Sequence, residues 1–224
     1  MNPLLGILQL TDSGFPSGAF TLSYGLETLV ADGAVRSPDD VAALLQVSLL
    51  DRLARADLVV LIGVHGASGL DEVLELDRRL STVKLAAGER TASQRVGRRL
   101  ANEVSRLTPD ALLASYVAAV DAGRTPGNAA TALGLALRAF RVPALEAAVA
   151  AAWGFANGLC TAAVRLGLIG HGDAQRILRE SGAVIEGAVA QAMAADPDRL
   201  RPSGPQLEVA LARHEIADAH LFAT

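Results

Sequence analysis

The stretch Ser37-Pro-Asp-Asp-Val-Ala-Ala-Leu-Leu-Gln-Val-Ser-Leu-Leu-Asp-Arg-Leu53 contains the signals that indicate the fold class. Ser37 is a typical N-cap, Pro38 suits the first helical position, and two aspartates follow where the helix dipole favours negative charge. Beyond them the apolar residues keep a 3.6-residue period, at Val41, Leu44, Leu45, Leu49 and Leu53. The stretch therefore predicts an amphipathic helix.

The same helix-start pattern recurs along the chain. It is repeated at Thr108-Pro109-Asp110, and weaker versions occur at Thr125-Pro126 and Val142-Pro143. No segment alternates apolar and polar residues in the manner of a strand. We expect an interrupted first helix and short helices before residue 36, and we place the helices at residues 38–65, 71–81, 83–107, 109–122, 126–140, 143–167, 173–195 and 206–221.

The sequence predicts an all-α, single-domain bundle of roughly eight to ten helices, with flexible N- and C-terminal docking segments. Neither an internal repeat nor a domain linker is found, so residues 1–224 are taken as one domain. Its predicted parts are an N-terminal docking segment over residues 1–36, a Pro-rich hinge over residues 196–205, and a C-terminal docking helix over residues 206–224.

Composition narrows the function classes. The chain has 224 residues and a net charge of −4, which argues against a nucleic-acid-binding protein because such proteins usually carry a basic excess. The single cysteine, Cys160, allows no internal disulfide and reads as a packed thiol. The stretch from Ala147 to Val164 carries no charge, yet its alanines and glycines favour a buried central helix over a membrane span. We therefore expect a cytoplasmic protein that does not enter membranes.

The N-terminal stretch from Gln9 to Glu27 combines glycines and a proline with large aromatic residues, a mixture that a long helix does not accommodate. Such a segment either inserts into its own core or docks on a partner. The docking interpretation makes large apolar side chains the anchors, with Gly18 allowing a turn between them. The candidate anchors are Phe15, Pro16, Phe20 and Tyr24 at this end, and Leu221 and Phe222 at the other.

Catalytic and metal-binding patterns are missing from the sequence. It has no P-loop, no nucleophile elbow, no His-Glu-x-x-His motif and no paired cysteines. His214 and Asp218 stand four residues apart and could present two metal ligands on one helix face, but we favour ordinary surface residues. The sequence thus predicts a protein without catalytic, cofactor-binding or metal-binding residues.

Residues 90–106 contain a band of arginines, at Arg90, Arg95, Arg98, Arg99 and Arg106. The band has two interpretations. It is either a solvated helix face, which we favour, or a functional surface. The functional surface would receive an acidic partner or offer an arginine to a nucleotide phosphate.

Four motifs follow one another in a fixed order between residues 7 and 222. The first comprises Ile7-Leu8-Gln9-Leu10, Asp12-Ser13, Pro16, Gly18, Phe20, Ser23 and Gly25-Leu26-Glu27. The second comprises Arg90, Ala92-Ser93 and Gly97-Arg98-Arg99-Leu100. The third comprises Trp153, Asn157, Ala162-Ala163-Val164-Arg165-Leu166, Gly170 and Gln175. The last comprises His214-Glu215 and Leu221-Phe222. As a set, these motifs resemble those of the urease accessory protein UreF family.

The resemblance implies an all-α protein that is not an enzyme and that acts as a scaffold while the nickel site of urease is assembled. A member of that family dimerises, binds the accessory protein UreD (also called UreH) through its two ends, and recruits the nickel-carrying GTPase UreG. The complex then acts on apo-urease, so that the complex handles nickel and the scaffold binds no cofactor tightly. The motif residues Glu27, Arg90, Arg98, His214 and Glu215 are therefore further candidates for partner contacts. The alternative function is a helical adaptor or regulator of another GTPase, with the arginine band as its contact surface.

Overall fold

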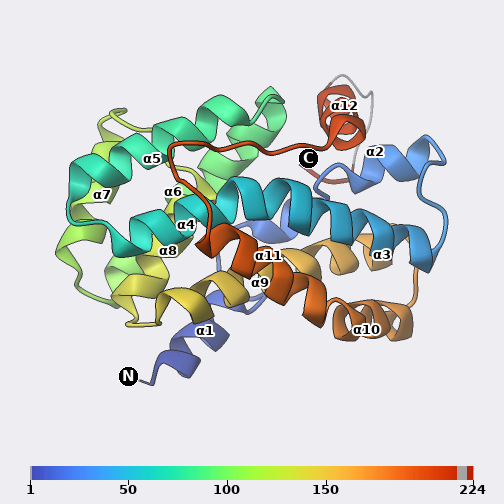
Figure 1. The fold of residues 1–224 in the computed structure, drawn as a ribbon, viewed down its shortest axis with the longest axis horizontal. Coiled ribbons are helices and arrows are strands. Elements are labelled where there is room, and N and C mark those ends of the chain that lie inside the picture. The colour runs from blue at the N-terminus through green and yellow to red at the C-terminus, as the bar shows by residue number, and fades with distance from the viewer. Residues whose placement is uncertain (1, 216–220, 224) are drawn as a thin grey trace.

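The structure, a computed structural model, describes residues 2–215 and 221–223 (Figure 1). Twelve α-helices make up most of this part of the chain: α1 Pro3–Thr11, α2 Leu26–Ala31, α3 Pro38–Val47, α4 Asp57–Gly66, α5 Leu70–Val83, α6 Ala87–Leu107, α7 Ala111–Asp121, α8 Ala129–Ala139, α9 Ala144–Arg165, α10 His171–Glu180, α11 Gly182–Met193 and α12 Pro205–His214. The described residues contain no strand. The prediction of an all-α single domain is confirmed, with slightly more helices than the eight to ten expected.

The extra helices arise where two predicted helices divide. The helix expected over residues 38–65 is interrupted as predicted, by a π turn at Ser48–Arg52 and a 3-10 turn at Leu53–Arg55. The helix expected over residues 173–195 is two helices, α10 and α11. They part at Ser181, whose hydroxyl donates to the carbonyl of Leu178 at 2.9 Å. A hydroxyl that bonds back to the preceding turn competes with the helix hydrogen bonds.

Local capping explains several helix starts. The hydroxyl oxygen of Ser37 accepts the N–H of Asp40 at 3.2 Å, and the Asp40 carboxylate accepts the N–H of Ser37 at 3.0 Å, which completes a capping box. At the start of α7 the cap is Asp110, whose carboxylate accepts the N–H of Leu113 at 2.8 Å. Both side chains satisfy backbone groups that would otherwise lack partners. At the second start, however, the cap is Asp110 and not the predicted Thr108, which instead follows the last residue of α6.

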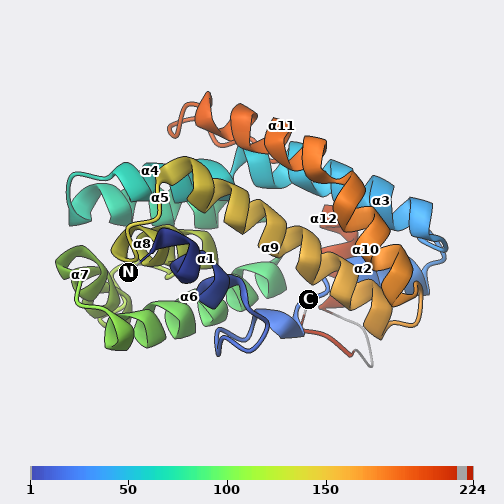
Figure 2. The same ribbon diagram turned by 90° about the horizontal axis from the view of Figure 1, so that it is seen from below.

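Helix α9 is the central helix of the fold. It packs against α4, α8, α10 and α11, and α1 lies along it (Figure 2). Nine of its residues are buried, seven of them alanines, and small side chains let neighbouring helices approach closely. By length and composition α9 could cross a membrane, but 50% of its most apolar window is buried inside the fold. In this structure it has the position of a core helix, as the sequence predicts.

A close approach of α6 to the segment before α8 depends on Gly97. A Cβ atom placed on Gly97 would lie 2.2 Å from the carbonyl oxygen of Gly127 and 2.7 Å from that of Asn128, both backbone atoms that cannot move freely. The carboxylate of buried Asp77 holds the same segment, because it accepts the N–H groups of Gly127 and Asn128 at 2.7 and 2.9 Å. The glycine therefore sets how closely α6 packs against the start of α8.

The Pro-rich segment predicted as a hinge runs across the fold between α11 and α12 (Figure 1). Its backbone is anchored at the interruption between α3 and α4. The N–H of Ser203 donates to the carbonyl of Asp51 at 2.8 Å, and the N–H of Arg201 donates to that of Arg55 at 3.1 Å. The turns that interrupt the helix thus leave backbone carbonyls without a helical partner, and these accept hydrogen bonds from the segment before α12. A hinge motion at residues 196–205 stays a prediction.

Candidate functional site: the junction of the two chain ends

Glu27, in the first turn of α2, holds the C-terminal residues against the N-terminal segment. Its Oε1 accepts the N–H of Leu221 at 2.6 Å, and its Oε2 accepts the N–H of Phe222 at 3.2 Å. The same Oε2 lies 3.1 Å from Nε2 of His214 at the end of α12. Glu27, predicted to contact a partner, is therefore the residue that joins the two ends of this chain.

The hydrogen bonds also favour the charged form of this carboxylate. Burial alone would raise the pKa of the Glu27 carboxyl. The N–H of Leu221, the ring of His214 and the N–H of Phe222 outweigh burial, and they lower the pKa below its ordinary value of 4.5. The junction is thus formed around an ionised carboxylate at neutral pH.

Arg165, the last residue of α9, joins the same two ends through aromatic rings. Its guanidinium carbon lies 4.1 Å from the ring centre of Phe20 and 4.3 Å from that of Phe222. Its Nη1 donates to the carbonyl oxygen of Phe20 at 2.7 Å. At these distances both rings make cation–π contacts. Arg165 was not among the predicted site residues, although it stands in the third motif.

The predicted anchors divide into accessible and packed side chains. Phe20 and Leu221 expose 54% and 60% of their surface, and Pro16 is also exposed. By contrast, Phe222 exposes 3%, whereas Phe15 and Tyr24 are partly buried against the core. The structure therefore leaves Pro16, Phe20 and Leu221 available to a partner, and it uses the other three anchors to hold the ends in place.

Tyr24 is a packing residue of the junction. Its ring centre lies 4.7 Å from that of Phe155 on α9. A Cβ atom on Gly158 would lie 3.1 Å from its hydroxyl oxygen, so the small residue makes room for the ring. Burial, with a smaller contribution from the negative charge of Asp57, raises the pKa of Tyr24 to about 12. The phenol is accordingly neutral across the physiological range.

Tyr24 and Phe15 line a cavity of about 300 Å³ between the N-terminal segment and α6, α8 and α9. Five charged side chains also line it, and four of them form a network of ion pairs. Arg52 donates to Glu89 at 3.0 Å, and Lys84 Nζ lies 2.9 Å from Asp57 and 3.2 Å from Glu89. These groups neutralise one another, as buried charges must.

The charged network also reaches the C-terminal helix. Arg52, from the π turn, pairs with Glu208 on α12 as well as with Glu89 on α6. Burial alone would lower the pKa of Arg52, but the two glutamates raise it. Sequence reasoning missed this network, because its members are scattered along the chain and no spacing connects them.

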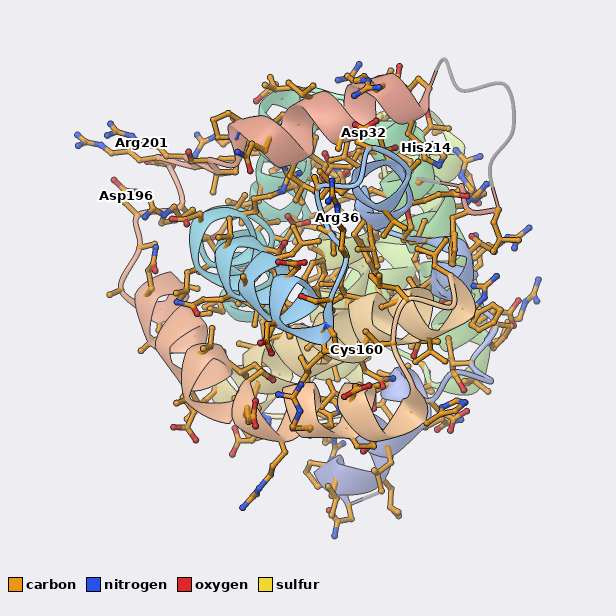
Figure 3. The ribbon with its side chains drawn as sticks, turned by 90° about the vertical axis from the view of Figure 1, so that its right-hand side faces the viewer. Asp32, Arg36, Cys160, Asp196, Arg201 and His214 are labelled. Atoms are coloured by element: carbon orange, nitrogen blue, oxygen red, sulfur yellow. The ribbon has the colours of Figure 1, made fainter. Side chains whose placement is uncertain are left out.

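Two further contacts fix α12 on the fold. Arg213 pairs with Asp32 at the end of α2, and Glu215 accepts the N–H of Gly88 at 2.7 Å in the first turn of α6. Figure 3 shows α12 above α2, with Asp32 and His214 labelled. His214 exposes only 5% of its surface, so the expectation of a surface histidine is wrong. Its proposed companion Asp218 lies outside the described residues. Within the described part of the chain, no three His, Cys, Asp or Glu residues form a metal cluster.

The arginine band is not one uniform surface. Arg90 donates to the carbonyls of Lys84 and Leu85 at 2.7 and 2.6 Å, so it closes the turn before α6. Arg106 pairs with Glu103 one turn away. Arg98 is exposed on the same helix. The two band residues predicted to bind a partner thus differ, since Arg90 has a structural role and Arg98 remains accessible.

Fold and site together define an all-helical, single-domain protein whose two chain ends are joined and present exposed apolar side chains. The family model of UreF matches residues 35–182. The chain is 32% identical to the urease accessory protein UreF of Arthrobacter sp. (strain FB24), over 97% of this chain and 96% of that protein. It is 33% identical to the UreF of Paenarthrobacter aurescens (strain TC1) over 97% and 96%, and 30% identical to that of Bacillus sp. (strain TB-90) over 99% of each. The chain belongs to the UreF family of urease accessory proteins.

Proposed function

We propose that this protein is a non-enzymatic scaffold for urease maturation. It binds UreD (UreH) through the junction of its two ends and recruits the GTPase UreG, and the complex acts on apo-urease to insert nickel in a GTP-dependent step. The protein works in the cytoplasm as a homodimer. It binds no cofactor tightly, because nickel is handled by the complex.

The observation that carries the proposal is the joined pair of chain ends, in a chain that aligns with urease accessory proteins over nearly its whole length. Exposed aromatic and aliphatic side chains at a rigid junction are the usual anchors of a protein interface. Phe20 and Leu221 have this character, and Glu27 and Arg165 fix the backbone that carries them. A preformed junction spares a complex much of the entropic cost of ordering two free ends.

The homodimer is supported by a second apolar surface. Neighbouring helices α1 and α9 expose large apolar side chains, and α1 contains no charged residue. Contiguous exposed apolar surface of this kind is a mark of interfaces. A second copy meeting it would encounter no like-charge repulsion from α1. The exposed side chains are Leu4, Leu5, Leu8, Leu145, Val149 and Trp153.

The experiment is a mixing measurement by size-exclusion chromatography with light scattering. The protein is combined with UreD and UreG of the same organism, in the presence of nickel and a GTP analogue. A stable complex with two copies of this chain supports the proposal. Absence of any complex from folded protein and active partners contradicts it, and an adaptor for a different GTPase then becomes the better assignment.

A matched pair of variants locates the docking surface. Phe20→Ala removes an exposed ring at the junction, and we expect it to weaken binding to UreD by about 2–4 kcal/mol. Met193→Ala removes an exposed apolar side chain at the end of α11 and should leave binding unchanged. A lower melting temperature with intact binding in Phe20→Ala would assign that ring to the core instead.

A further inference from the structure

Three arginines of the band lack a carboxylate partner in residues 2–215 and 221–223. Arg95, Arg98 and Arg99 project from α6 within little more than one turn, and all are exposed. Several arginines elsewhere do pair with carboxylates, as Arg79 does with Glu75 and Asp198. Side chains at spacings of three and four residues share a helix face. These guanidinium groups therefore concentrate positive charge in a protein whose net charge is −4.

The N-terminal loop lies against this helix face. Arg95 Nη2 donates to the hydroxyl oxygen of Thr21 at 3.3 Å. A Cβ atom on Gly18 would lie 3.2 Å from Nη1 of Arg99, so the loop passes close to that guanidinium. Gly18 has a φ of +80°, a backbone conformation that suits glycine and that turns the loop here. The arginines and the loop thus form one continuous surface.

An exposed aromatic ring lies beside these charges. Phe20 belongs to the same loop, and the guanidinium of Arg165 covers one side of its ring at 4.1 Å. Arg165, like the three arginines of α6, pairs with no carboxylate in the part of the chain that the structure describes. The basic patch, defined as Arg95, Arg98, Arg99 and Arg165 around Phe20, combines arginine with an aromatic residue, and both kinds of side chain are enriched at protein interfaces.

We propose that the basic patch is a docking site for an acidic segment of a partner protein in the maturation complex. The planar guanidinium binds a carboxylate through two parallel hydrogen bonds, and a fixed row of arginines suits a segment with several carboxylates. The exposed ring of Phe20 receives an apolar side chain of the same segment. The inference rests on the proposed function and adds to it the chemistry of the partner surface.

Charge complementarity favours a protein partner over nucleic acid. A phosphate backbone extends well beyond a patch of this size and would meet the acidic remainder of the surface. A short acidic segment interacts with the patch alone. The patch is also distinct from the charged residues that line the cavity, because Arg52 and Lys84 are already neutralised by their carboxylate partners.

The test uses two charge-reversed variants of the full-length protein. Arg98→Glu/Arg99→Glu reverses the patch at exposed positions, so the fold should be retained, which circular dichroism checks. Arg199→Glu/Arg201→Glu makes the same change in charge on the segment before α12. That segment and α6 lie on opposite sides of the molecule (Figures 1 and 2), and Arg201 points outward at its edge in Figure 3. Affinities for UreD and for UreG are measured separately at low and at physiological salt.

We expect Arg98→Glu/Arg99→Glu to lose at least about 10-fold in affinity for one of the two partners and to show a weaker salt dependence. The control should bind like the wild type, and Arg98→Lys/Arg99→Lys should recover part of the affinity. If the charge-reversed variant binds both partners as tightly as the wild type does, the docking site is overturned and the proposed function still stands.

A second probe separates failure of the docking site from failure of the proposed function. If the wild type binds neither UreD nor UreG, the proposed function fails. Binding of a fluorescent peptide, made of glutamates around one tyrosine, then tests the basic patch independently of UreD and UreG. The docking site is supported if the wild type binds this peptide in a salt-dependent manner and the Arg98→Glu/Arg99→Glu variant does not. No binding, or tighter binding of an oligonucleotide of equal charge, overturns it.

Discussion

The carboxylate of Glu27 lies 3.1 Å from Nε2 of His214, a residue 187 positions further along the chain. This contact connects the first turn of α2 to the last turn of α12. The same carboxylate accepts two backbone N–H groups of the C-terminal residues. The two ends of the protein, which the sequence presents as independent segments, therefore form one structural unit in which disturbance of one end affects the other.

Glu27→Gln should reduce the free energy of unfolding by about 1–3 kcal/mol at pH 7, because the amide is uncharged and has one acceptor oxygen, so its NH2 group faces one of the two N–H groups that the carboxylate accepts. The pKa of Glu27 is lowered in the folded protein, so its stabilisation is fully present above the unfolded value of 4.5. The stabilisation is lost as the pH falls through the folded-state pKa. Urea unfolding at several pH values measures both effects. Glu186→Gln, on an exposed face of α11, is the control and should change little.

Phe222 and Leu221 are adjacent, but replacement by alanine should destabilise the protein at the first position and have little effect at the second. Phe222→Ala removes a buried ring and a contact with Arg165, and we expect a loss of about 3 kcal/mol in stability. Leu221→Ala removes an exposed side chain and should change stability by less than about 0.5 kcal/mol. Thermal melting distinguishes the two. Equal small effects would mean that the C-terminal residues leave the junction in solution.

Arg52→Met tests the charged network. It leaves Glu89 and Glu208 without their shared partner, and breaking a buried ion pair on one side costs about 3 kcal/mol or more. Arg55→Met, three residues later, removes an exposed pair with Asp51 and an exposed hydrogen bond to the carbonyl of Leu50, and it should cost at most about 1 kcal/mol. Hydrogen exchange should additionally show loss of protection in α12 for the first variant. Unchanged protection in α12 would contradict a role for Arg52 in holding that helix.

Gly97→Ala should destabilise the protein by about 3 kcal/mol, because the added methyl group meets the backbone carbonyls of Gly127 and Asn128. Gly187→Ala places the same methyl group in α11 where no atom lies within 4 Å. That variant should gain about 0.5–1 kcal/mol from the better helix propensity of alanine. Denaturant midpoints of the two variants should therefore move in opposite directions. A stable Gly97→Ala variant would mean that α6 can shift away from α8.

Sequence reasoning predicted most helices because their signals are local. The capping box of Ser37 and Asp40, and the apolar period that follows it, lie within one helix. The same reasoning predicted that the helix over residues 38–65 is interrupted, and the structure divides it into α3 and α4. It did not predict the division between α10 and α11, since a single serine at position 181 gives a weak signal. It also extended the last helix to residue 221, whereas α12 ends at His214 and residues 216–220 lie outside the described part.

Several residues of the candidate site were predicted individually, but their exposure and their contacts with one another were not. The aromatic residues and Glu27 were selected because apolar anchors and motif residues stand out in a sequence. Which of them face solvent was not accessible to that reasoning: Phe20 and Leu221 are exposed, whereas Phe222 is buried. Arg165 also stands in a motif, but it was not selected because the motif does not indicate which of its residues contact other segments. Its role depends on two rings from opposite ends of the chain.

The sequence by itself determined the helical class, the positions of most helices and the burial of α9, because capping, periodicity and the absence of charge act over a few neighbouring residues. The tertiary structure alone decided how the ends meet. Arg52 pairs with residues 37 and 156 positions away, and Glu27 reaches across 187. Contacts at such separations depend on how the helices pack against one another, so no local pattern encodes them.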